Sequence, residues 1–225
     1  MGKIDLKLST ISSKVVMAIA GLFLMSFLVV HLSINLLMLI QDNGEAFKSG
    51  VNFMTTNPVI KVFEYVLFGG FLIHIIFGIM IEISNYFARP IKYAVASKST
   101  TSFLSKYMIY SGIAIFVFLV IHFTHFYFVK LGWLVSDYTT DKHAFLIMAM
   151  NVFANPYFVS FYIICFIFLG FHLRHAFQSA FQTLGLNHPK YTPFIKFLAT
   201  LYALVIVIGF TFIPIHFFFF NNILK

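Results

Sequence analysis

Residues 14–40 read KVVMAIAGLFLMSFLVVHLSINLLMLI, and this stretch decides the fold. After the lysine at its start, its only ionisable side chain is that of His31. A mostly apolar stretch of about 18 residues or more is long enough to cross the hydrocarbon core of a bilayer as a helix. The stretch therefore predicts a membrane-spanning helix with one imidazole inside it.

Four further stretches of the same kind follow, at residues 59–87, 105–130, 157–184 and 194–220. Of the 225 residues, 60% are hydrophobic and only 10% are charged. The five stretches use almost the whole chain, so residues 1–225 are predicted to form one all-α integral membrane domain with five transmembrane helices. The apolar run after the opening lysines has no small-residue cleavage pattern, which predicts a retained first helix, not a signal peptide.

The composition excludes several kinds of site. Cys165 is the only cysteine, so the chain has no thiolate cluster for iron-sulfur or zinc, and it has no glycine-rich dinucleotide loop. The net charge of +8 comes from basic residues near the ends of the apolar stretches, which argues against nucleic acid as a partner. They gather at the N-terminus and in the second and fourth loops, which predicts a cytoplasmic N-terminus and an outside C-terminus.

The predicted helices have clear start signals. Asn57-Pro58, Asn155-Pro156 and Thr192-Pro193 each offer a capping side chain followed by a proline at the first helical position. Ser12-Ser13 is expected to cap the first helix in a similar way. These starts allow the depth of a residue in the membrane to be judged from its number, at about 1.5 Å of rise per residue.

Four histidines, one in each of the first four helices, form two pairs by depth. His31 and His122 both lie about 25 to 30 Å from the cytoplasmic starts of their helices. His74 and His172 both lie about 24 Å from the outer starts of theirs. The first pair therefore shares an outer level, and the second pair shares an inner level.

The two halves of the chain repeat one another, which supports this pairing. In the first and third helices a glycine, Gly21 or Gly112, stands ten residues before the histidine. In the second and fourth helices three landmarks recur at an offset of 98: Ala46-Phe47, Asn57-Pro58 and His74 match Ala144-Phe145, Asn155-Pro156 and His172. A duplicated helical hairpin places the first helix opposite the third and the second opposite the fourth.

Paired histidines inside a membrane point to a metal cofactor. A lone histidine in a spanning helix is more simply an interhelical hydrogen-bonding group, whereas an ionisable residue at this depth is costly and marks a functional site. Two neutral imidazoles on one iron make a six-coordinate haem suited to electron transfer. Carboxylates and thiols that would indicate a di-iron or zinc site are missing from both levels, so the pattern predicts two haems.

The chain resembles the di-haem cytochrome b subunit of succinate:quinone oxidoreductases, of the single-chain five-helix type. The resemblance covers most of the chain and is strongest around the histidines. A glycine 13 residues after the fourth ligand is a family feature, and Gly185 stands 13 after His172. The segments that carry the resemblance are SSKVVMAIAGLFLMSFLVVHLSINL, EAFKSGVNFMTTNPVIKVFE with the later FLIH, FLVIHFTHF and FHLRHAFQSAFQTLG.

The resemblance implies two haem b groups. His74 and His172 would hold the inner haem, near a cytoplasmic iron-sulfur subunit, and His31 and His122 the outer haem. Electrons would pass through them to or from a quinone, menaquinone by the resemblance, while a flavoprotein subunit carries out succinate oxidation or fumarate reduction. The chain would act as the membrane subunit of this enzyme, surrounded by lipid in a bacterial cytoplasmic membrane. With the flavoprotein and iron-sulfur subunits it would form a heterotrimer, which could itself form oligomers.

Other histidines compete for these roles. His125 and His175 each follow a predicted ligand by three residues and so lie on the same helix face, one turn away. The repeat and the glycine spacing favour His122 and His172. His175 and Arg174 lie on the cytoplasmic side of His172, where haem propionates need polar partners, although Arg174 would also suit a snorkelling role. The remaining histidines, His143, His188 and His216, receive no role.

Two glutamates and one glycine complete the predictions. Glu64 is a candidate for proton exchange at a quinone site or for stabilising the start of its helix, and Glu82 is expected at the surface. Some fumarate reductases of the family carry a glutamate two residues before the fourth ligand, where this chain has Gly170, which argues against a proton path there.

Further expectations concern helix packing. The fifth helix has no ionisable residue before His216 and is expected to support the haem-binding bundle from outside. The phenylalanines at 217–220 are expected to face lipid, and AFLIMAMNVF is predicted to form a short interfacial helix over the outer haem.

Two alternatives stay open. A cytochrome b anchor of a hydrogenase or formate dehydrogenase would also bind two haems. A histidine-lined transporter or proton channel would bind none, but the chain lacks broken helices and further intramembrane charges of the kind that transport sites use.

Overall fold

The computed structural model describes residues 10–87, 108–134 and 144–220, and all regular structure within them is helical. The elements are α1 (Thr10–Leu36), η1 (Leu37–Leu39), α2 (Glu45–Thr56), α3 (Pro58–Phe87), α5 (Met108–His122), η2 (Phe123–Tyr127), α6 (Phe128–Lys130), α7 (Ala144–Phe153), α8 (Pro156–Thr183) and α9 (Thr192–Phe220). Of these, η1 is a 3-10 helix and η2 is π-helical.

Five helical stretches are long and apolar enough to cross a membrane: Ile11–Leu39, Pro58–Asn85, Met108–Lys130, Pro156–Thr183 and Thr192–Phe220. They match the five predicted spans to within a few residues, so the all-α multi-pass membrane fold is confirmed. Residues 105–107 of the predicted third helix, and the basic loop before them, lie outside the described residues.

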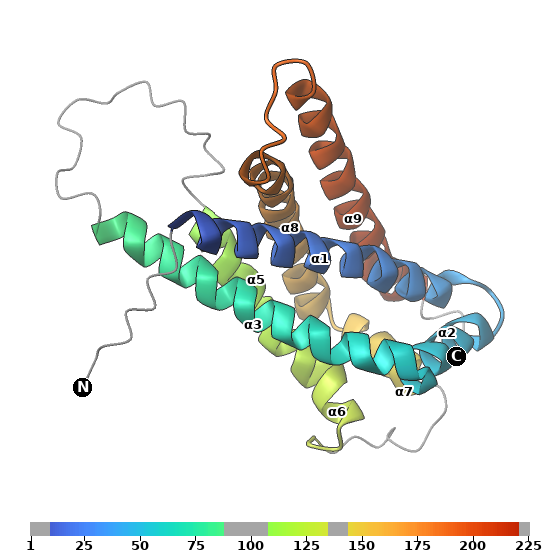
Figure 1. Cartoon of the computed structure of the whole chain (residues 1–225). Helices are drawn as coiled ribbons and strands as arrows, with labels where there is room; N and C mark the ends of the chain where they lie inside the picture. Colours follow the sequence, from blue (N-terminus) through green and yellow to red (C-terminus); the bar gives the residue numbers. More distant parts are fainter. Residues whose placement is uncertain (1–9, 88–107, 135–143, 221–225) are drawn as a thin grey trace, which may run out of the picture.

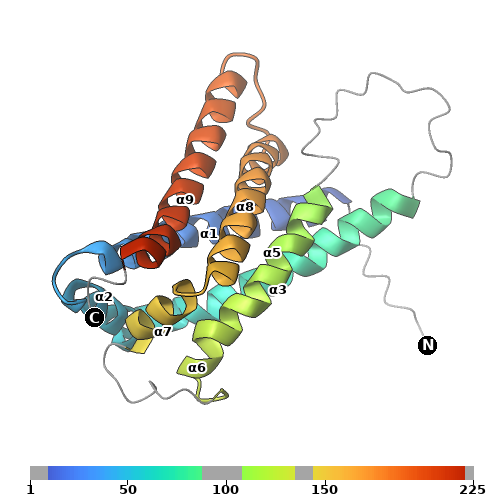
Figure 2. The same cartoon turned by 180° about the vertical axis from the view of Figure 1, so that it is seen from behind.

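The first four long helices form a ring in which α1 packs between α3 and α8, and α5 packs against α8. The ribbon of α5 crosses that of α3 in both views (Figures 1 and 2), and Glu64 and Phe68 of α3 contact Tyr127 of η2, which continues α5. Around this ring α1 lies diagonally opposite α5, and α3 lies diagonally opposite α8. The last helix, α9, packs on α8 and α1 and covers that side.

The helix starts agree with the sequence signals at two places. Asn57 Oδ1 accepts the Val59 N–H at 2.9 Å, and Asn155 Oδ1 accepts the Tyr157 N–H at 2.9 Å. The predicted Thr192 cap is wrong, because Thr192 is itself the first residue of α9 and its hydroxyl donates to the His188 carbonyl at 2.8 Å. The predicted Ser12-Ser13 cap is also wrong, since both serines lie inside α1.

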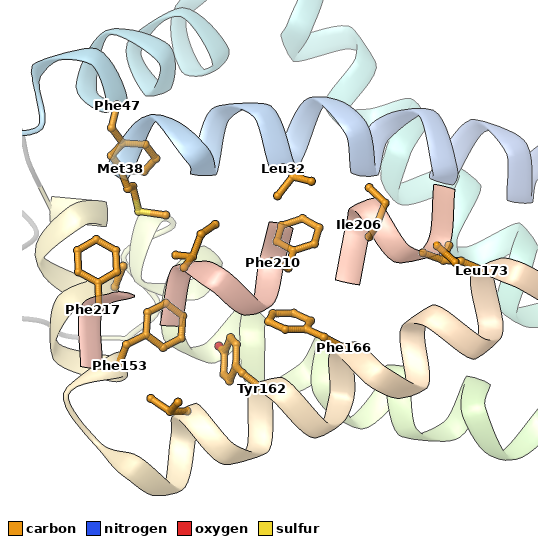
Figure 3. Close-up of a cluster of buried hydrophobic side chains, with 14 of the residues drawn as sticks. Leu32, Met38, Phe47, Phe153, Tyr162, Phe166, Leu173, Ile206, Phe210 and Phe217 are labelled. Carbon is orange, nitrogen blue, oxygen red and sulfur yellow. The ribbon is translucent and has the colours of Figure 1, made fainter. Parts of the chain in front are cut away.

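The apolar core lies between α1, α8 and α9 and is rich in aromatic rings (Figure 3). The predicted lipid-facing run at 217–220 is divided, because Phe217 is buried in this core whereas Phe219 and Phe220 are exposed. The ring centroid of Phe210 lies 5.6 Å from that of His31. The fifth helix therefore contacts a predicted ligand directly and does not stay outside the site as expected.

Glycines allow α9 to lie this close. A Cβ at Gly170 of α8 would stand 2.6 Å from Cγ2 of Val207, and a Cβ at Gly209 of α9 would stand 2.7 Å from Cδ2 of Leu32. Distances this short are too close for real side chains, so larger residues would push α9 away. Some fumarate reductases of the resembled family carry a glutamate at the position of Gly170. Here the space beside Gly170 is occupied by Val207 of α9.

Two short helices cover the end of the bundle nearer His31 and His122. α2 packs on α1 and α3, and α7 packs on α8 and α9. They occupy equivalent places in the repeat and bury Phe47 and Phe153 in the core (Figure 3). The predicted short helix over AFLIMAMNVF is present as α7.

Candidate functional site

His31 and His122 face each other across the bundle. Their ring centroids lie 5.9 Å apart, with the ring planes at 84°. Each ring also stacks on a phenylalanine one turn earlier in its own helix: Phe27 on His31 at 5.3 Å, and Phe118 on His122 at 5.5 Å. Residues four apart share a helix face, so the same packing recurs on α1 and α5.

His74 and His172 form the second pair, from α3 and α8. Their ring centroids lie 6.2 Å apart, with the planes at 71°. A glycine lies beside each ring: a Cβ at Gly21 would stand 3.5 Å from Cε1 of His74, and a Cβ at Gly112 would stand 3.7 Å from Cε1 of His172. The structure thus brings together the four histidines in the two combinations expected from depth.

The geometry of both pairs fits bis-histidine coordination of an iron. Imidazoles on opposite sides of one metal, each bound at about 2.0 Å, have ring centroids about 6 Å apart. In addition, Nδ1 of His122 is buried without a hydrogen-bond partner among the described residues. Buried polar atoms without partners are rare and need a cause, and a site for a bound ion or cofactor is one such cause.

The donor set narrows the kind of metal group. In residues 10–87, 108–134 and 144–220, no three histidine, cysteine, aspartate or glutamate side chains gather into one metal-binding cluster. Each histidine pair supplies only two ligands, so the remaining ligands of a bound metal must come from a group other than these side chains. A porphyrin supplies four nitrogens in a plane, so each pair suits a haem better than a structural zinc ion.

A cavity of about 240 Å³ opens next to the inner pair. It lies where α1 and α5 begin and α3 and α8 end, and its lining includes Lys14, Gly21, His74 and His175. Lys14 was not among the predicted site residues, although its place in the first turns of a spanning helix was a signal for it. The cavity would give haem propionates a cation and an imidazole as partners.

The two residues predicted to contact propionates, Arg174 and His175, point in different directions in the structure. His175 lines the cavity, whereas Arg174 is exposed and its Nε donates to Thr200 Oγ1 on α9 at 3.1 Å. Adjacent residues on a helix point about 100° apart, so only one of them can face the inner pair. The structure therefore favours His175 over Arg174 for this role.

His125 forms a hydrogen bond with Tyr162 of α8. Its Nδ1 lies 3.0 Å from the hydroxyl of Tyr162, whose side chain is 2% exposed, and the two rings stack at an angle of 13°. His125 sits in the π-helical turn η2, which begins directly after His122. Single π turns change the direction of the following side chains and are frequent at functional sites.

We expect Tyr162→Phe to destabilise the protein by about 1 kcal/mol, because it removes one interhelical hydrogen bond. The measurement is a double-mutant cycle of thermal unfolding with Tyr162→Phe, His125→Phe and both changes together. If the two losses simply add, the hydrogen bond between these side chains contributes nothing to stability.

Glu64 is paired across two helices. Its Oε1 accepts from the Tyr127 hydroxyl at 3.0 Å and from Lys130 Nζ at 3.2 Å. Asn57, not Glu64, accepts the first N–H groups of α3, so the helix-start role is not what the structure shows. The cluster lies near the N-terminal end of α3, where a carboxylate, a phenol and an ammonium group meet.

The remaining ionisable residues have other surroundings. Glu82 is exposed, as expected. His188 is exposed in the connection before α9, and His216 packs against Phe212 and Phe220. His143 lies outside the described residues.

Two polar side chains that the sequence analysis missed lie next to predicted ligands. Asn35 Nδ2 lies 3.4 Å from His31 Nδ1, and Ser111 Oγ lies 3.2 Å from His172 Nδ1. Neither forms a motif with its histidine in the sequence. Comparisons with models of protein families, with curated proteins and with solved structures found no match for this chain.

Proposed function

We propose that this chain is a di-haem cytochrome b that carries electrons across part of a membrane. The observation that supports this most is the presence of two histidine pairs, at 5.9 and 6.2 Å between ring centroids, on four helices related by an internal repeat. Each imidazole comes from a different helix. A haem in each pair would therefore also hold the bundle together.

The chain's own residues have distinct tasks in this proposal. A bound haem would supply an iron that takes up and releases one electron at a time. His74 and His172 would hold the inner haem, and His31 and His122 would hold the outer one. The stacked Phe27 and Phe118 keep the outer imidazoles in place. His175 and Lys14 line the cavity next to His74 and would be the polar partners of the propionates of an inner haem.

We further propose that the chain is the membrane anchor of a succinate:quinone oxidoreductase. The resemblance around all four histidines supports this, and the single cysteine means that iron-sulfur centres belong to a partner subunit. The inner pair would take electrons from that subunit, which is itself served by a flavoprotein, and the outer pair would exchange them with menaquinone. In this proposal the N-terminus lies in the cytoplasm of a bacterium.

The purified chain is expected to contain two haem b groups per polypeptide, because the two pairs offer two bis-histidine sites. The measurement is a dithionite-reduced minus oxidised visible spectrum with pyridine haemochrome quantification. A colourless protein, folded with haem available, would mean that the histidines form a polar network and would favour the transporter alternative.

The identity of the complex needs a separate experiment. A tagged chain purified gently from its native membrane is expected to bring a flavin-containing subunit with it. Succinate, but neither hydrogen nor formate, should then reduce its haems. Reduction by hydrogen or formate alone would assign the anchor to the other class of quinone-linked enzymes.

A further inference from the structure

Ser111 connects the predicted ligand His172 to the backbone of a neighbouring helix. It lies on α5, one residue before Gly112, and is 7% exposed. Its Oγ lies 2.8 Å from the Met108 carbonyl oxygen and 3.2 Å from His172 Nδ1. The serine thus stands between a backbone acceptor and an imidazole.

The hydrogen-bond directions follow from the chemistry of the three groups. A serine hydroxyl has one proton, and a carbonyl oxygen can only accept. The shorter contact, to Met108, therefore takes the hydroxyl proton. Ser111 Oγ then accepts from His172, which requires the proton of the neutral imidazole to be on Nδ1.

This arrangement selects one tautomer of His172. With the proton on Nδ1, the lone pair of Nε2 is free to bind a metal. Metal-bound histidines commonly donate their other N–H to an oxygen, which fixes the ring and makes it a stronger donor to the metal. Ser111 supplies that oxygen.

The other half of the repeat lacks this contact. At an offset of 91, α1 and α5 match at Met17 and Met108, at Gly21 and Gly112, and at each ligand. The counterpart of Ser111 at this offset is Ala20. Nδ1 of His74 is buried and makes no hydrogen bond to a side chain in the described part of the chain, although this imidazole interacts with the backbone of Met17. The two inner histidines therefore differ in their partners, a serine hydroxyl for His172 and backbone alone for His74, although the sequence around them repeats.

We propose that Ser111 is a positioning residue that holds His172 with its proton on Nδ1 and so lowers the midpoint potential of the haem shared by His74 and His172. The statement about potential rests on the proposed function, whereas the statement about the tautomer does not. A stronger imidazole donor stabilises ferric over ferrous iron, which gives the direction of the shift.

The first test compares haem potentials in the purified chain. Ser111→Ala should raise the midpoint potential of one haem, leave the other unchanged, and weaken retention of the first haem by about tenfold or more. Ser111→Thr keeps a hydroxyl and should behave like the unchanged protein. Ser26→Ala is the matched control, because Ser26 Oγ also bonds the carbonyl three residues earlier, at 2.7 Å from Phe23, but is exposed. Unchanged potentials in Ser111→Ala would overturn the proposal.

The second test needs no haem. In protein prepared without haem and labelled with ¹⁵N-histidine, the side-chain signal that disappears in His172→Ala should show a protonated Nδ1. Ser111→Ala should move that signal toward the other tautomer. A protonated Nε2 in the unchanged protein would overturn the inference even if Ser111→Ala does not fold.

The two tests separate the inference from the proposed function. Absence of haem with an Nδ1 proton on His172 would refute the cytochrome proposal and the effect on potential, and would support only the tautomer assignment. Two haems with potentials that ignore Ser111 would refute the inference and leave the cytochrome proposal standing.

Discussion

His172→Ala is expected to reduce the haem content of the purified chain from two groups to one. The His172 ring lies 6.2 Å from that of His74 and beside Gly112, so alanine leaves His74 without an opposing ligand. The outer pair belongs to other helices and keeps its own geometry. Pyridine haemochrome quantification per chain measures the loss, and in the proposed complex electron transfer from succinate to quinone should stop with it.

Two histidine variants control this experiment. His188→Ala removes an exposed imidazole in the connection before α9 and should keep both haems. His125→Ala should also keep both, because Tyr162 already engages His125. Retention of two haems by His172→Ala would refute its assignment as a ligand. Loss of a haem in His125→Ala, but not in His122→Ala, would move the outer ligand by one turn.

Much of the fold follows from local signals in the chain. Long apolar stretches set the number of helices, and Asn57 and Asn155 fix the starts of α3 and α8 through side-chain bonds to backbone N–H groups. The internal repeat relates the two helical hairpins to each other. The depth of each histidine in its helix then pairs His31 with His122 and His74 with His172. These features are predictable because each depends on residues close in sequence or on a count along a helix.

The contacts around the histidines were not predictable in the same way. Spanning helices that are apolar on all sides carry little information about which face meets which neighbour. The bonds of Ser111 to His172 and of Arg174 to Thr200 depend on that rotation. The π turn η2 changes the direction of the side chains that follow His122, and no glycine or proline within the turn marks it in the sequence. The side chains that contact the histidines could therefore be identified only in the packed structure.

Gly170→Leu is expected to destabilise the protein by about 1 to 3 kcal/mol, the usual cost of forcing extra volume into a packed interface. Even a Cβ at this position would stand 2.6 Å from Val207, whose branched side chain has little rotational freedom in a helix. The helix α9 would have to move away from α8. Thermal unfolding in detergent measures the change.

Two further variants show whether the contact itself is responsible. Gly69→Leu is the matched control, because Gly69 also lies in a spanning helix but has nothing within 4 Å of its Cβ position among the described residues, so it should cost far less. Val207→Ala should restore part of the stability lost in Gly170→Leu by making room for the leucine. Equal losses at Gly170 and Gly69, with no rescue, would show that the close approach of α8 and α9 is not what requires glycine.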